Sequence, residues 1–169
     1  YKVIRCLDPF RVWDFHSEDE PHLTDVNCED RTQVSDFRWG NRWPYEAAIA
    51  LSNEIHADPW IAIPHTATRE YTETLAQMFL DGLDPGIKVY IEFSNECWND
   101  WSTTFRHARE QGRAEGLWAA DEPENEHQLA INWCAVQAVN HTNIFEQVFA
   151  DAGQGDRVVR VFAGFTAVP

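Results

Sequence analysis

A carboxyl group and an amide stand side by side at Asn95 and Glu96, with Trp98 and Trp101 close behind. A carboxyl group can give a proton to a reacting oxygen or take one from it, and an amide can hold a hydroxyl group. Indole rings add flat apolar faces on which a sugar ring can lie. This set of side chains is typical of a site for carbohydrate chemistry.

The residues before this pair predict a strand over 87–94, launched by a turn at Pro85-Gly86. Apolar and polar side chains alternate along it. This pattern is typical of an open sheet with one face exposed to water, or of a barrel strand whose inward face is partly polar. Glu92 falls on the polar face, one layer below Glu96. A buried charge there needs a partner, and Arg5 is the residue that the pattern offers.

Three further strands are expected, near 2–7, 59–63 and 157–162. Helical periodicity and capping residues predict the elements between them. These are a helix starting at Pro44, one capped by Thr66 or Thr68 and ending at Gly82, and helices over 103–116 and 128–150. Alternating strands and helices predict a parallel sheet with right-handed crossovers.

The connections that follow strands are mostly long and rich in aromatic, histidine and acidic residues, whereas those that follow helices are short. This asymmetry is typical of a (β/α) barrel, whose strand-to-helix loops build the active site. A doubly wound sheet is the alternative, because its ligands also bind at the carboxyl ends of strands. The glycine fingerprint G-x-G-x-x-G of that fold follows no strand here.

The segment 10–43 is long and aromatic, so we interpret it as an ordered binding loop. Its Trp13 and Trp39 join the later tryptophans as candidate platforms for a sugar, although each could equally pack within its own loop. His65 follows a strand and is expected either to contact substrate and support Glu96, or to be a satisfied structural histidine. No spacing typical of a metal site is found, and we expect neither metal nor cofactor.

Composition limits the partners of the chain. Its 169 residues are 44% hydrophobic, which indicates a globular domain with a core. The formal charge of −15 argues against nucleic acid and anionic membranes, and no apolar run reaches the length of a membrane span. The chain begins and ends on predicted strands, so we expect a piece of a longer protein that is poorly stable alone.

Four cysteines occur without C-x-x-C spacing, which argues against a zinc ribbon or a thioredoxin-type site. Cys134 lies in a helical pattern and is expected to be a small buried apolar residue. In an exported protein Cys6 could pair with Cys28, but four cysteines allow three pairings and the sequence does not choose among them.

The stretch from Lys88 to Asn99 resembles clan A of the glycoside hydrolases, in which the fourth strand of a (β/α)8 barrel ends in Asn-Glu. Asn95-Glu96 match that pair, and Trp98-Asn99 extend it as in several clan members. The wider run from Glu46 is similar to large secreted bacterial proteins often labelled cellulose-binding, and the likeness covers about two-thirds of the chain. It implies a partial TIM barrel: residues 1–169 would hold about strands two to five of eight, in one domain truncated at both ends.

The resemblance also implies a function. Glu96 would be the general acid/base of a secreted retaining glycoside hydrolase whose substrate is a polysaccharide or oligosaccharide. Asn95 would bind the 2-hydroxyl of the sugar. The clan's nucleophile is a Glu at the end of the seventh strand, and no residue of this sequence matches it. The alternatives are a non-catalytic carbohydrate-binding barrel and an unrelated barrel enzyme that uses Glu96 as a base.

Overall fold

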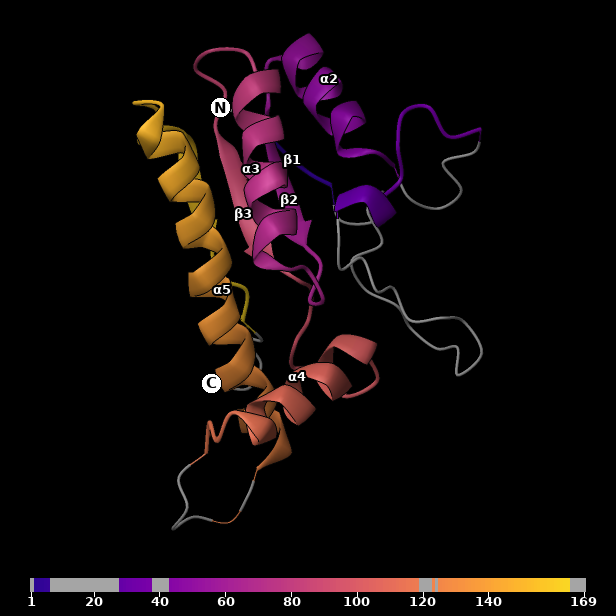
Figure 1. Ribbon diagram of the computed structural model, residues 1–169, viewed down its shortest axis with the longest axis vertical. Helices are drawn as coiled ribbons and strands as arrows, with labels where there is room; N and C mark the ends of the chain where they lie inside the picture. Colours follow the sequence, from indigo (N-terminus) through magenta and orange to yellow (C-terminus); the bar gives the residue numbers. More distant parts are fainter. Residues whose placement is uncertain (1, 7–27, 38–42, 119–122, 124, 165–169) are drawn as a thin grey trace.

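A four-stranded parallel sheet forms the centre of the computed structural model, which describes residues 2–6, 28–37, 43–118, 123 and 125–164 (Figure 1). The strands lie side by side in chain order. They are β1 (Val3–Arg5), β2 (Asp58–Ile63), β3 (Val89–Phe93) and β4 (Val158–Val161). The predicted parallel pairing of all four strands is confirmed.

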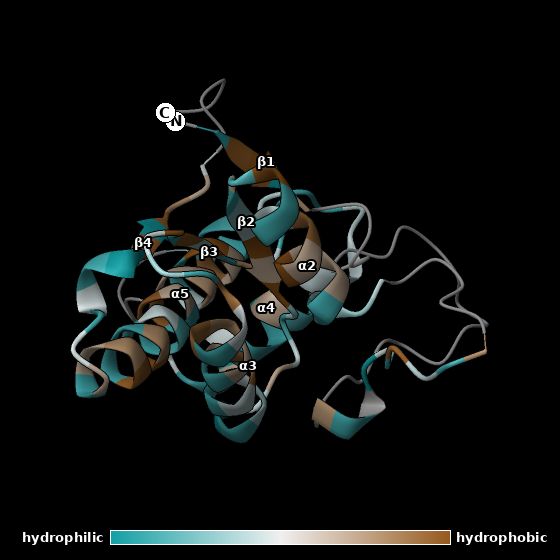
Figure 2. Ribbon diagram, turned by 90° about the horizontal axis from the view of Figure 1, so that it is seen from above, coloured by the Kyte–Doolittle hydropathy of each residue, from teal (hydrophilic) through white to brown (hydrophobic). Residues whose placement is uncertain are grey.

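Helices cover one face of this sheet. Figure 2 shows α2, α3 and α5 on the same side of the strands, and Figure 1 places α4 beyond the carboxyl ends of the strands. The helices are α2 (Tyr45–Ile55), α3 (Arg69–Gly82), α4 (Thr103–Ala114) and α5 (Glu126–Asp151), with short 3-10 turns η1 (Cys28–Asp30) and η2 (Gly155–Arg157). In the part of the chain that the structure describes, no helix is long and apolar enough to cross a membrane.

Three of the helices begin at a side chain that accepts a backbone hydrogen bond. Thr68 caps α3, as one of the two predicted capping residues, and Ser102 and Asn125 cap α4 and α5. Pro44 is not the first helical residue that the sequence predicted. It stands one place earlier as the N-cap of α2, with extended backbone angles.

Gly82 is the last residue of α3, as predicted, but its role differs from that of a left-handed helix stop. The capping residue Leu83 has an extended conformation. A Cβ atom at Gly82 would lie 2.9 Å from the side chain of Ile49, so the glycine allows α2 and α3 to approach each other.

The core lies between the sheet and the helices. Val89, Ile91 and Phe93 are all buried on the helix side of β3, which confirms the predicted faces of this strand. Phe93 packs edge-to-face on Trp133 of α5, at 5.9 Å between ring centroids. At the opposite end of β3, the buried Arg157 donates hydrogen bonds to the carbonyl groups of the loop before the strand, at Ile87, Leu83 and Asp84.

The crossing of α4 over α5 depends on Gly112. A Cβ atom there would lie 2.5 Å from the carbonyl oxygen of Leu129, and a backbone atom cannot move aside as a side chain can. We therefore expect Gly112→Ala to lower the free energy of unfolding by about 1–3 kcal/mol in spite of alanine's higher helix propensity.

Gly82→Ala is the matched comparison, because its new methyl group meets only the movable side chain of Ile49. Chemical denaturation of the two variants and of the wild type measures the difference. A smaller loss for Gly112→Ala than for Gly82→Ala would contradict the close helix crossing.

Candidate functional site

The candidate site lies where β2 and β3 end. Asn95 and Glu96 follow β3 directly, and His65 follows β2 at the same edge of the sheet. Parallel strands bring the residues after their carboxyl ends together, which is where ligands bind in such sheets. The sequence-based placement of Asn95 and Glu96 at this edge is what the structure shows.

The backbone of this turn is unusual for residues with side chains. Ser94 has a φ of 56° and Glu96 a φ of 47°, both in the left-handed region. Such angles cost free energy and persist only where the surroundings enforce them, often at functional sites. Here the amide of Ser94 donates a 2.7 Å hydrogen bond to the carbonyl oxygen of Ile63 at the end of β2.

The buried carboxylate of Glu92 organises the open face of the sheet below this turn. Glu92 as a residue is 1% exposed, and its Oε2 accepts hydrogen bonds from Arg5 Nη2 at 3.0 Å and from Trp60 Nε1 at 2.8 Å. The guanidinium of Arg5 also stacks on the Trp60 ring, 4.8 Å from its centroid. The predicted ion pair of Glu92 with Arg5 is confirmed, whereas the part played by Trp60 was not foreseen.

Arg5 links this ion pair to the candidate site. Its Nη2 also donates a 3.4 Å hydrogen bond to Oδ1 of Asn95, which is 5% exposed. Because the oxygen of the Asn95 amide is occupied by a donor, the amide nitrogen is the group left to donate to a ligand.

Asn99 holds the half-buried Glu96. The Nδ2 of Asn99 donates a 3.1 Å hydrogen bond to Oε2 of Glu96, and the backbone amide of Asn99 donates a 2.9 Å hydrogen bond to the carbonyl oxygen of Glu96. The carbonyl oxygen of Asn99 accepts a 2.8 Å hydrogen bond from Ser102, the cap of α4. The carboxylate of Glu96 is therefore oriented by the start of the following helix, a contact that the sequence analysis did not predict.

His65 joins the site through hydroxyl groups. Its Nδ1 lies 3.2 Å from Oγ1 of Thr104, which in turn lies 3.2 Å from Oγ of Ser94. The ring of His65 also packs on His107 at 5.2 Å between centroids, and burial holds the pKa of His107 below its ordinary value. These contacts tie β2, β3 and α4 together, which gives His65 a structural role at the edge of the site.

The candidate sugar platforms fall into two groups. Trp101 is 68% exposed, and Trp98 is half-buried against a cavity beside Glu96. Both rings are thus carried by the same turn as Asn95 and Glu96. Trp13 and Trp39, the other two candidates, lie outside the described residues.

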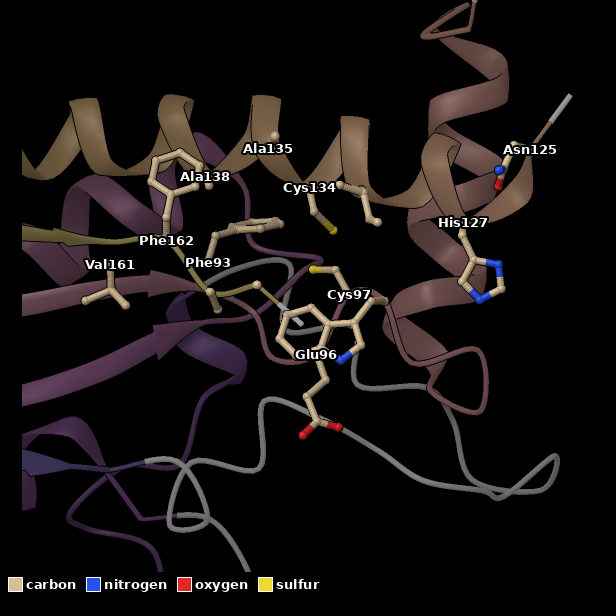
Figure 3. Close-up of a pocket in the computed structure, with 14 residues that line it drawn as sticks. Phe93, Glu96, Cys97, Asn125, His127, Cys134, Ala135, Ala138, Val161 and Phe162 are labelled. Carbon is tan, nitrogen blue, oxygen red and sulfur yellow. The ribbon is translucent and has the colours of Figure 1, made fainter. Parts of the chain in front are cut away.

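The cavity, of about 580 Å³, lies on the helix side of the sheet (Figure 3). Apolar side chains from the end of β3, the residues after β4 and the start of α5 line most of its wall. Figure 3 shows the sulfur atoms of Cys97 and Cys134 pointing toward each other at its wall, while the carboxylate of Glu96 points away from them. Glu96 therefore stands at the rim, with its oxygens directed away from the apolar interior.

All four cysteines are free thiols, so the Cys6–Cys28 pairing is not seen, and Cys134 is buried as expected. Among the described residues, no three His, Cys, Asp or Glu side chains gather in a group that could hold a metal ion.

A buried histidine supports the site from the helix side. His141 of α5 stacks on Phe93 at 5.0 Å between ring centroids, and its Nδ1 lies 2.7 Å from Oγ1 of Thr72. The hydroxyl of Thr72 also donates to the carbonyl oxygen of Thr68, so the Nδ1–H tautomer of His141 suits this network. Burial lowers the pKa of His141 from 6.5 to about 4.

This shift predicts how stability depends on pH. The unfolded chain binds the proton of His141 below pH 6.5, whereas the folded chain binds it only near pH 4. The stabilising contribution is therefore complete above pH 6.5 and is lost as pH falls through 4, by about 3 kcal/mol in all. Denaturation of the wild type and of His141→Gln across this range measures it.

His127→Gln is the control for this comparison, because His127 is exposed. We expect it to keep the wild-type pH dependence, while His141→Gln makes the change in stability between pH 6.5 and 4 smaller. The same slope in both variants would show that His141 does not carry the effect.

The ion pair on the open face predicts a second stability result. Arg5→Met leaves the buried Glu92 carboxylate without its cation, so we expect a loss of about 3 kcal/mol. The double variant Arg5→Met/Glu92→Gln should recover most of it, because an uncharged amide can still accept from Trp60. Equal losses in the single and the double variant would mean that the pair is not coupled.

Comparison of the chain with family models, curated proteins and solved structures found no match.

Proposed function

We propose that this chain is part of a retaining glycoside hydrolase in which Glu96 is the general acid/base. One observation carries the proposal: a half-buried carboxylate in a left-handed backbone conformation stands at the carboxyl edge of a parallel sheet, beside a buried amide. Chemistry at such edges is a general property of barrels built from parallel strands. The resemblance of Asn95-Glu96 to the clan A motif supports the same assignment.

The arrangement of the sheet supports the proposal that this chain is a segment of a (β/α)8 barrel. The strands follow chain order without reversal, and α2, α3 and α5 cover one face only (Figure 2). A doubly wound sheet has helices on both faces and reverses its strand order at the ligand site. The open face here carries Glu92 and Arg5, which suits the partly polar interior of a barrel.

The proposed mechanism gives each residue of the turn a role. Glu96 protonates the oxygen of the leaving group as the glycosidic bond breaks, and later takes a proton from the attacking water. Asn95, whose oxygen is held by Arg5, donates its amide N–H to the 2-hydroxyl of the sugar. Trp98 and Trp101 offer ring faces for the sugars of a polysaccharide or oligosaccharide.

A retaining mechanism also needs a second carboxylate about 5 Å from the first. Glu92 is unsuited to that part, because Arg5 and Trp60 already bind its oxygens. The proposal therefore places the nucleophile outside these 169 residues, as the resemblance implies, in a secreted protein of which this chain is one part. The chain by itself is then expected to be inactive.

A non-catalytic carbohydrate-binding barrel is the second candidate. The observation that favours it is that Glu92, the acidic residue just before Asn95 and Glu96 on this strand, is already neutralised by its ion pair. The exposed ring of Trp101 would serve binding and hydrolysis equally well. Catalysis by Glu96 is thus the point on which the two candidates differ.

Glu96→Gln in the protein that contains this chain tests the proposal. An amide cannot protonate the leaving oxygen, so we expect hydrolysis of the natural polysaccharide to fall by about a hundredfold or more. Bond cleavage in an aryl glycoside with a good leaving group needs little protonation and should be much less affected. Turnover of the glycosyl-enzyme should then stall, which burst kinetics would record.

Glu110→Gln is the control, because Glu110 is an exposed carboxylate of α4 away from the turn. It should leave both substrates unaffected. Equal losses on both substrates in the bond-breaking step would rule out the acid role of Glu96. No loss on either would favour the carbohydrate-binding barrel.

A further inference from the structure

Two cysteines from distant parts of the chain meet at the wall of the cavity. Cys97 follows Glu96 in the turn after β3, and Cys134 lies in α5. Both line the same cavity, and Figure 3 shows the two sulfur atoms pointing toward each other. The proposed function uses neither of them.

The surroundings keep this pair together. Cys97 is 8% exposed and Cys134 is 7% exposed, and both line the cavity rather than the outer surface. The hydrogen bond with Cys97 and burial both raise the pKa of Cys134, which keeps it a neutral thiol in the reduced protein.

We propose that Cys97 and Cys134 are a modification site, at which a low-molecular-weight disulfide such as glutathione disulfide oxidises the pair to an intramolecular disulfide. The thiolate of Cys97 attacks one sulfur of the oxidant, forms a mixed disulfide and releases one thiol. The sulfur of Cys134 then attacks the sulfur of Cys97, and the second thiol leaves. Two protein thiols are oxidised, one disulfide oxidant is reduced to two thiols, and protons pass from the protein sulfurs to the products.

In the described part of the folded chain, the other two cysteines have no thiol neighbour with which to complete an intramolecular disulfide. Burial raises the pKa of Cys6 to about 11, and its Sγ contacts the carbonyl oxygen of Ile4. Cys28 lies against Arg31, whose Nε donates to its sulfur at 3.3 Å. Neither makes a thiol contact of the kind that joins Cys97 to Cys134.

The bond would fix the turn that carries the candidate site. It would link the residue after Glu96 to α5 and close a loop over residues 97–134, which contains all of α4. Closing a loop of this length restricts the unfolded chain, so we expect Tm to rise by about 5–10 °C. This inference does not depend on the proposed function, because its test needs neither substrate nor activity.

The test is oxidation of the folded 169-residue chain by glutathione disulfide, followed by peptide mapping without reduction. We expect the chain to lose the mass of two hydrogen atoms and the map to show one linkage, Cys97 to Cys134. The same oxidation in guanidinium chloride is the reference, because unfolded chains favour the shorter loop between Cys6 and Cys28. The ratio of the Cys97–Cys134 peptide to all other linkages should be at least about tenfold higher in the folded chain.

A variant in which Cys6 and Cys28 are both serine removes the competing thiols. It should still lose the mass of two hydrogen atoms and gain the same Tm shift on oxidation, whereas Cys134→Ser should stop at the mixed disulfide with glutathione. Trapping of Cys97 and Cys134 as separate free thiols after oxidation of the folded wild type would overturn the proposal. A linkage pattern equal to that of the unfolded reference would overturn it as well.

Discussion

A carboxylate that is 1% exposed must be neutralised within the protein, and Glu92 is the residue that sets this condition. It stands on β3, while its two partners, Arg5 and Trp60, come from β1 and β2. The three strands are thereby fixed in register, because a slip of one residue would turn Glu92 into the apolar core between sheet and helices. The same Arg5 reaches on to Asn95 and so connects the charge inside the sheet to the turn above it.

The turn is held from both sides. On the open face Arg5 donates a hydrogen bond to Asn95. At the start of α4, Ser102 donates a hydrogen bond to Asn99, and Asn99 donates one to the Glu96 carboxylate and so orients it. On the helix side the residues of β3 pack into a core of aromatic rings and a neutral buried histidine. The positive φ angles at Ser94 and Glu96 are stable only because these contacts fix the backbone before and after them.

Much of the fold follows from local patterns in the sequence. The alternation along β3 predicted its buried face, and the pairing of Glu92 with Arg5 followed from the need to neutralise a charge. Contacts between elements distant in sequence could not be predicted, since they depend on how helices approach one another. The crossing at Gly112, the anchoring of Arg157 and the role of Trp60 are of this kind. In the candidate site, the residues were predicted from the motif, but the hydrogen bond of Asn99 and the strained backbone were not.

We propose above all that the turn from Ser94 to Trp101 is a carbohydrate site. It is tested most directly by nuclear magnetic resonance of the isotopically labelled chain during titration with a panel of oligosaccharides. The account predicts that at least one of them shifts the amide signals of Asn95 and Glu96 and the indole signal of Trp98 or Trp101. Signals of this turn that stay unchanged with every oligosaccharide, or shifts confined to another part of the chain, would contradict it.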